Sequence, residues 1–184
     1  MNLRFREAKT TQTAARLLKL RGGSMSYMKL IKLLYLVDRE ALLRWGRPVT
    51  GDRYVSMDRG PVLSRTLNLI TEEPCPGEDS TWAHHISKPQ NYEVQLSKDA
   101  PQDELSEAEA QLIEEIFGKF GTMSRWDLVE FVHQLPEWQN PEGSAIPIQY
   151  RDILRAGGKT DAEITAILQE IDSLAMADAL LPSR

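Results

Sequence analysis

The sequence predicts a mainly α-helical (α+β) domain, built around a central buried helix, with a small antiparallel β-sheet inserted in the middle. Three observations predict it. The most apolar segment, SYMKLIKLLYLVDREALLRWG at residues 26–46, keeps helical spacing. Capping boxes at 106–109 and 160–163 precede further apolar residues at helical spacing. Alternating stretches between residues 53 and 96 are typical of strands. We expect residues 1–160 to form the domain and residues 161–184 to form a helix that packs on it or extends it.

The first helix is expected at Thr13–Leu20, where Gly22 and Gly23 stop it. Ser24 or Ser26 can then cap the central helix. That helix is apolar over most of its circumference, which is typical of a helix packed on several sides. It ends at Gly46, and a proline two residues later prevents its continuation.

A strand is expected at Arg53–Met57, followed by a tight turn and a helix. Gly60 allows the turn, and Pro61 pre-sets the first helical φ angle of a helix that runs to Ile70. The acidic segment 71–80 contains two prolines and a glycine, which indicates an exposed loop. Two more strands are expected at 82–86 and 92–96, joined by a hairpin turn at 88–91. With Arg53–Met57 they would form a three-stranded sheet.

The rest of the chain is expected to be helical. A helix capped by Ser106 runs to Gly121, and Ser124 caps a helix that ends at Pro136. A short helix follows at 148–155. The last helix begins behind the capping box at residues 160–163.

The cysteine content and the apolar runs predict a protein of a reducing compartment that does not span a membrane. A single cysteine, Cys75, cannot form an internal disulfide, so a cytoplasmic location is expected. The first ten residues lack the apolar core of a secretory signal. No apolar run approaches the roughly 20 residues that a membrane-spanning helix needs.

Charge is distributed unevenly along the chain. Residues 1–70 hold 14 Lys and Arg against 5 Asp and Glu, a net of +9, whereas residues 71–184 hold 8 against 22, a net of −14. Two interpretations follow. The two parts pack together and neutralise each other, or they form a bipolar surface that docks charged partners.

The residues that could perform catalysis are few. Adjacent histidines at 84 and 85 would point to opposite faces of a strand, so we expect neither a metal site nor a cofactor. His133 precedes Glu137 by four residues, which leaves open a His–carboxylate pair or a histidine that supports the loop at Trp138. Asp38 is interpreted as a charge at the edge of the core, paired with a nearby Lys or Arg.

Nucleic acid is not favoured as a partner. The arginines around the first strand alternate with acidic residues, and residues 38–65 lack the clean basic excess of phosphate binders. No helix-turn-helix pattern is evident.

The segment MKLIKLLYLVDREALLRWGRPVTGDRYVSMDRGPVLSRTLNLI resembles the Panacea domain, the SocA-like antitoxin domain of prokaryotic and phage toxin–antitoxin systems. The likeness includes the KLxKLLYxxD helix, the G-x-P-x-T-x-D turn, a strand and the GPV corner, and it continues to Ile146 and Pro147. It covers about residues 14–160. The resemblance implies a structural role for these motif residues: Lys29, Leu33, Leu34, Tyr35, Asp38, Gly60, Pro61, His133, Pro136 and Trp138.

This resemblance implies a non-enzymatic antitoxin that neutralises a toxin encoded next to it by direct contact. In one branch of the family, the antitoxin is an adaptor that delivers the toxin to a AAA+ protease. Two alternatives remain open from the residues: a DNA-binding regulator, and a hydrolase that uses His133 with a carboxylate.

The contact surface is expected near the first strand. Arginine anchors interfaces well because it combines a rigid fork of donors with an apolar stem. We hypothesise that the toxin contacts Arg47, Arg53, Tyr54, Asp58 and Arg59. The alternative is that these arginines pair with the acidic later part of the chain and stabilise only the fold.

Overall fold

The computed structural model describes residues 3–72 and 79–180. Most of the loop expected at 71–80, including Cys75, lies outside them. In the described residues eight helices form: α1 (Glu7–Leu20), α2 (Tyr27–Trp45), α3 (Ser64–Thr71), α4 (Thr81–His85), α5 (Glu107–Phe120), α6 (Arg125–His133), α7 (Tyr150–Ala156) and α8 (Asp161–Leu180). The strands are β1 (Ser24–Ser26), β2 (Tyr54–Met57), β3 (Gly60–Leu63), β4 (Glu93–Gln95) and β5 (Ile146–Ile148).

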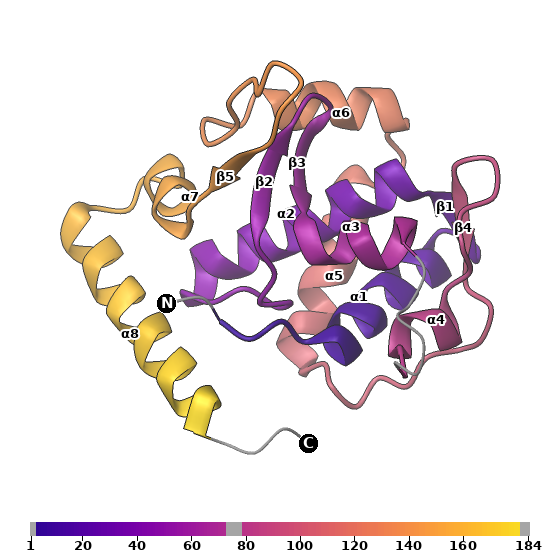
Figure 1. Cartoon of the computed structure of the whole chain (residues 1–184), viewed down its shortest axis with the longest axis horizontal. Coiled ribbons are helices and arrows are strands. Elements are labelled where there is room, and N and C mark those ends of the chain that lie inside the picture. Colours follow the sequence, from indigo (N-terminus) through magenta and orange to yellow (C-terminus); the bar gives the residue numbers. More distant parts are fainter. Residues whose placement is uncertain (1–2, 73–78, 181–184) are drawn as a thin grey trace.

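Helix α2 runs through the centre of the molecule, as predicted (Figure 1). It packs against α1, α5, α6, α7 and strand β3. Leu33 and Leu34 are fully buried in the core cluster. The predicted mainly α fold with a small antiparallel sheet is therefore confirmed.

Helix ends follow the sequence signals closely in the second half. Ser106 and Ser124 cap α5 and α6, each in a reciprocal bond with the residue three positions later. Thr160 makes the same bonds with Glu163 before α8. Helix α1, in contrast, begins six residues before the expected start.

Helix α8 lies along the outside of the fold beside α7 (Figure 1). Ile164 and Ile171 of α8 are buried in the same core cluster as α2. The division of the chain at residue 160 stays a prediction.

The β-structure differs from the prediction. Strand β2 lies between β3 and β5, both antiparallel to it, and β4 pairs instead with β1, the segment just before the central helix. Residues 82–86 do not form a strand. Most of that stretch is α4, which Ser80 caps by accepting a hydrogen bond from Ala83 N, and which buries Trp82.

The corner at residues 57–61 is a β-hairpin rather than a strand-to-helix turn. Met57 pairs with Gly60, so Asp58 and Arg59 form the turn. Pro61 lies in β3 and does not open a helix, so that prediction was wrong. Strand β3 is at the edge of its sheet, where proline is tolerated because its missing N–H breaks no ladder bond.

Gly60 has a φ angle of +94° and lies against α6. A Cβ atom there would come within 2.5 Å of Val132 Cγ2. We expect Gly60→Ala to lower the free energy of unfolding by about 1–3 kcal/mol, since it combines a left-handed backbone with overpacking. The matched control is Gly143→Ala, because Gly143 has a φ of +81° but no atom within 4 Å of the added Cβ. Equal losses in chemical denaturation would show that the contact with Val132 is unimportant.

Ion pairs within the fold join basic residues of the first part of the chain to acidic residues of the second part. Basic residues of α1 and α2 pair with acidic residues of α5: Lys9 with Glu109 at 2.8 Å, Arg16 with Glu114 at 2.5 Å, and Arg44 with Glu115 at 2.8 Å. These ion pairs support the interpretation in which the two parts of the chain neutralise each other, and the bipolar surface that docks a charged partner stays a prediction.

Candidate partner-binding site

A polar side chain occurs at every third position of the central helix: Lys29, Lys32, Tyr35 and Asp38. All four are buried. Three residues rotate a helix about 60° short of a full turn, so successive members point in different directions. Each therefore reaches a different neighbouring segment.

The two lysines bind backbone carbonyl oxygens. Lys29 Nζ donates to Gly121 O and Met123 O, each at 2.6 Å, and so ties α2 to the turn between α5 and α6. Lys32 Nζ donates to Pro61 O at 2.8 Å. Burial lowers the pKa of Lys32 to about 7. The lysines of the family-like motif thus position the turn before α6 and strand β3.

Asp38 has no cationic partner among the described residues, and the prediction of an ion pair at the edge of the core was wrong. Its carboxylate is fully buried and accepts hydrogen bonds from Val49 N, Thr50 N, the Thr50 hydroxyl and the Tyr54 hydroxyl. Burial raises the pKa of Asp38 to about 6. The aspartate therefore holds the turn before β2 in place.

A buried ion pair connects the central helix to the loop after α6. Arg39 Nε lies 2.6 Å from Glu137 Oε1, and the Tyr35 hydroxyl donates to the same oxygen at 3.0 Å. The Glu137 side chain has no exposed surface. Burial and the neighbouring Glu137 carboxylate raise the pKa of Tyr35.

His133 supports the loop at Trp138 and forms no pair with Glu137. Its ring stacks on Trp138 with the centroids 4.1 Å apart. Trp138 Nε1 donates to Met57 O at 3.1 Å, which fixes the hairpin. Burial lowers the pKa of His133. Pro136 is exposed in the turn that follows α6. The His–carboxylate pair of the hydrolase alternative is not formed.

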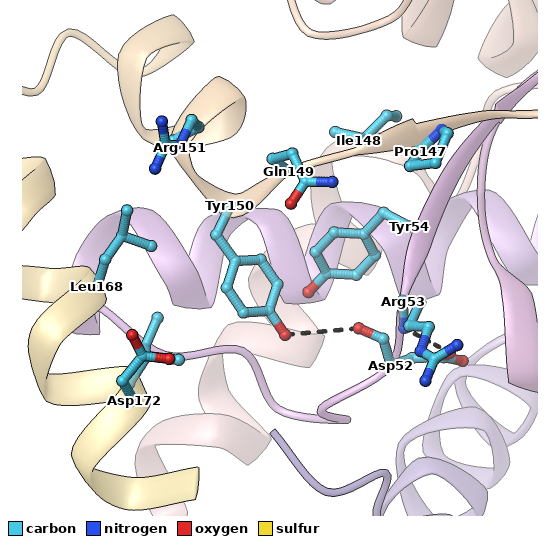
Figure 2. A pocket seen from close by; sticks show the side chains of 11 residues that line it. Asp52, Arg53, Tyr54, Pro147, Ile148, Gln149, Tyr150, Arg151, Leu168 and Asp172 are labelled. Carbon is cyan, nitrogen blue, oxygen red and sulfur yellow. Dashed lines mark hydrogen bonds between the residues drawn. The ribbon is translucent and has the colours of Figure 1, made fainter. Parts of the chain in front are cut away.

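A cavity of about 450 Å³ is lined by residues in or next to β2, β5, α7 and α8. Figure 2 shows the rings of Tyr54 and Tyr150 in its centre, with Arg151 and Arg53 on different sides. The Asp52 carboxylate, beside Arg53, is already saturated by bonds from backbone N–H groups and from Thr66. Asp172 of α8 also lines this cavity, so its charges are mixed.

The arginines proposed to contact the toxin do not form one patch. Arg53 lines the cavity of Figure 2, Arg47 lines a different hollow beside Arg6, and Arg59 lies at the tip of the β2–β3 hairpin. The four residues of β2, at about 3.3 Å each, separate Arg53 from the hairpin tip by roughly 13 Å. Tyr54 is only 2% exposed, so its side chain offers little surface to a partner, and the contact set stays a hypothesis.

The hairpin tip takes part in a surface that the sequence did not reveal. We call it the Trp126 hollow. It encloses about 200 Å³ where the hairpin meets the starts of α2 and α6, and it is lined by Tyr27, Met28, Arg59, Tyr92, Arg125 and Trp126, together with Ser26. Trp126 is 51% exposed and Tyr92 is 66% exposed.

Arginine and aromatic side chains are in contact in the Trp126 hollow. The guanidinium carbons of Arg59 and Arg125 lie 5.8 Å and 5.2 Å from the Trp126 ring centre, within the range of a cation–π interaction. The rings of Tyr27 and Tyr92 are 6.4 Å apart. Asp58, beside Arg59, is exposed and accepts a hydrogen bond from Gly143 N at 2.9 Å.

Other kinds of site are not evident in the described residues. Over residues 3–72 and 79–180, no group of three or more His, Cys, Asp or Glu side chains is arranged to hold a metal ion. Among the helices of the same part of the chain, none has the length and apolarity to cross a membrane.

Comparison with known proteins defines the class. A family model described as "Antitoxin SocA-like, Panacea domain" matches residues 30–139. That match covers more than half of the chain, from the central helix through the hairpin and α6 to the loop at Trp138. The chain therefore belongs to the SocA-like antitoxin, Panacea domain family. No match was found among curated proteins or among solved structures.

Proposed function

We propose that this protein is a non-enzymatic antitoxin of the cytoplasm that neutralises a toxin, encoded by an adjacent gene, through direct protein–protein contact. Membership of the SocA-like antitoxin family supports the class. The observation that carries the contact is the Trp126 hollow, where two large aromatic side chains are more than half exposed. Tryptophan, tyrosine and arginine are the residues most enriched at the energetic centres of protein interfaces.

The rigidity of the hollow supports the same conclusion. The hairpin tip is held by Trp138 through Met57 O, and the turn before α6 is held by Lys29. A contact surface that is already in its bound shape loses less conformational freedom on association. The buried polar groups of the family-like motif thereby position Arg59 and Trp126.

We expect Trp126→Ala to abolish protection when the adjacent gene is co-expressed, because truncation removes the ring on which both guanidinium groups lie. Growth after toxin induction and co-purification of the two proteins measure the effect. The matched control is Trp45→Ala, since Trp45 is also exposed, at 37%, but lies at the far end of α2. We expect that variant to protect cells fully.

Two results would contradict the proposal. If the Trp126→Ala variant still protects cells and still co-purifies with the toxin, the hollow is not the contact surface. If the wild-type protein protects cells without binding the toxin, direct neutralisation is wrong. The lifetime of the toxin separates two modes of action: masking leaves it unchanged, whereas a protease adaptor shortens it.

A further inference from the structure

The Trp126 hollow carries positive charge that has no counter-charge. Neither Arg59 nor Arg125 has a carboxylate partner among the described residues, and no acidic side chain lines the hollow. Both guanidinium groups lie against one indole ring, so their carbons are at most about 11 Å apart. The two guanidinium groups therefore place two positive charges on one side chain of the hollow, which favours an anionic partner there.

The neighbouring acidic side chains are engaged elsewhere. Asp58 accepts its hydrogen bond from Gly143 N. Asp127, two residues after Arg125, accepts one from Ser124 N at 3.2 Å in the capping box of α6. Neither carboxylate forms an ion pair with Arg59 or Arg125 in the described part of the chain.

The start of α2 adds to the attraction for an anion. Ser26, the residue before the helix, makes no capping hydrogen bond, and the first turn contains no acidic residue. The first N–H of α2, that of Tyr27, donates to Tyr92 O at 2.9 Å, and the helix N-terminus still carries partial positive charge from the helix dipole. Ser26, Tyr27 and Met28 all line the hollow, so this end of the helix adjoins the same space as the two arginines.

We propose that the Trp126 hollow receives an acidic side chain, Asp or Glu, from the partner protein. The carboxylate lies between Arg59 and Arg125, and Trp126 and Tyr92 cover the apolar part of the partner's segment. This inference rests on the proposed function, since it names the chemistry of the toxin at the same surface. A nucleic-acid phosphate is disfavoured because the chain carries a net charge of −5, which repels a polyanion.

The first test uses the full chain and the purified product of the adjacent gene. We expect Arg59→Gln with Arg125→Gln to weaken binding at least 30-fold and to reduce its dependence on salt concentration. The matched control is Arg151→Gln with Arg155→Gln, which makes the same charge change on the exposed face of α7, away from the hollow. We expect that control to bind like wild type.

The outcomes separate the two proposals. If Trp126→Ala weakens binding but the Arg59 and Arg125 double variant does not, the hollow is the contact and the acidic anchor is wrong. If neither change weakens binding, both are wrong. Circular dichroism and thermal melting of each variant verify that the fold is intact.

A second test does not depend on the toxin. A display library of random 12-residue peptides is selected against the wild-type protein and counter-selected against the Arg59→Gln, Arg125→Gln double variant. Enrichment of Asp or Glu next to an apolar residue supports the inference, and enrichment without acidic residues overturns it. Binding of a 20-base-pair DNA duplex that the double variant loses would also overturn it, because the anion would then be a phosphate.

Discussion

Replacement of Arg39 by methionine is expected to lower the free energy of unfolding by about 3–5 kcal/mol, the usual cost of leaving one buried charge without its partner. Glu137 has no exposed side-chain surface, and Arg39 is its only cationic partner in the described part of the chain. Methionine preserves the apolar stem, so the loss reports the charge rather than the packing. Urea denaturation monitored by circular dichroism measures it.

Two further variants define the cause of that loss. Arg39→Met combined with Glu137→Gln should recover most of the stability, because the amide oxygen still accepts the hydrogen bond of Tyr35 without a buried charge. The matched control is Arg44→Met, which removes two exposed ion pairs of the same helix, with Glu40 and Glu115, and should cost at most about 1 kcal/mol. If Arg39→Met and Arg44→Met cost the same, the buried pair does not anchor the loop after α6.

The second large effect is expected at Leu34. This side chain is fully buried at the centre of α2. Leu34→Ala should cost about 2–5 kcal/mol, the sum of lost apolar burial and the cavity that remains. Leu20→Ala is the control, because Leu20 is 41% exposed at the end of α1. A thermal melt of Leu34→Ala that matches wild type would contradict the placement of α2 in the core.

Most of the longer helices were predictable from the sequence because their signals are local, whereas α4 was expected as a strand and α1 begins six residues before its expected start. A serine or threonine followed three residues later by a carboxylate marked the starts of α5, α6 and α8, and both partners of each capping bond lie within four residues of one another. The apolar circumference of α2 placed it in the centre. Such signals do not depend on the rest of the fold.

The strands were less predictable because their partners are distant in sequence. Strand β1 has three residues and pairs with β4, about 70 residues away, and β5 pairs with β2 across more than 90 residues. Strands β1 and β5 have three residues each and show no alternation long enough to identify them, whereas β4 lies within the strand predicted at 92–96. Trp82 and Ile86 suggested a strand face, but four-residue spacing also fits a helical turn, and α4 is helical.

The motif residues were identified, but most of their roles required the structure. Asp38 suggested an ion pair, yet its partners are neutral groups in the turn before β2. The three-residue spacing of polar side chains in an apolar helix was a visible signal that each binds a separate segment. Trp126 lies outside the apolar face of α6, and this position in the sequence could have indicated an exposed aromatic side chain available for contact. The separation of Arg53 from Arg59 depends on the hairpin and could not be read from charge alone.

We propose that this protein binds its toxin directly through the Trp126 hollow. Isothermal titration of the purified adjacent-gene product into the purified wild-type, Trp126→Ala and Trp45→Ala proteins tests it most directly. We predict a saturable complex for wild type and Trp45→Ala, and no detectable heat of binding for Trp126→Ala at the same concentrations. Equal affinities for all three folded proteins, or no complex with the wild-type protein, would contradict direct binding through the Trp126 hollow.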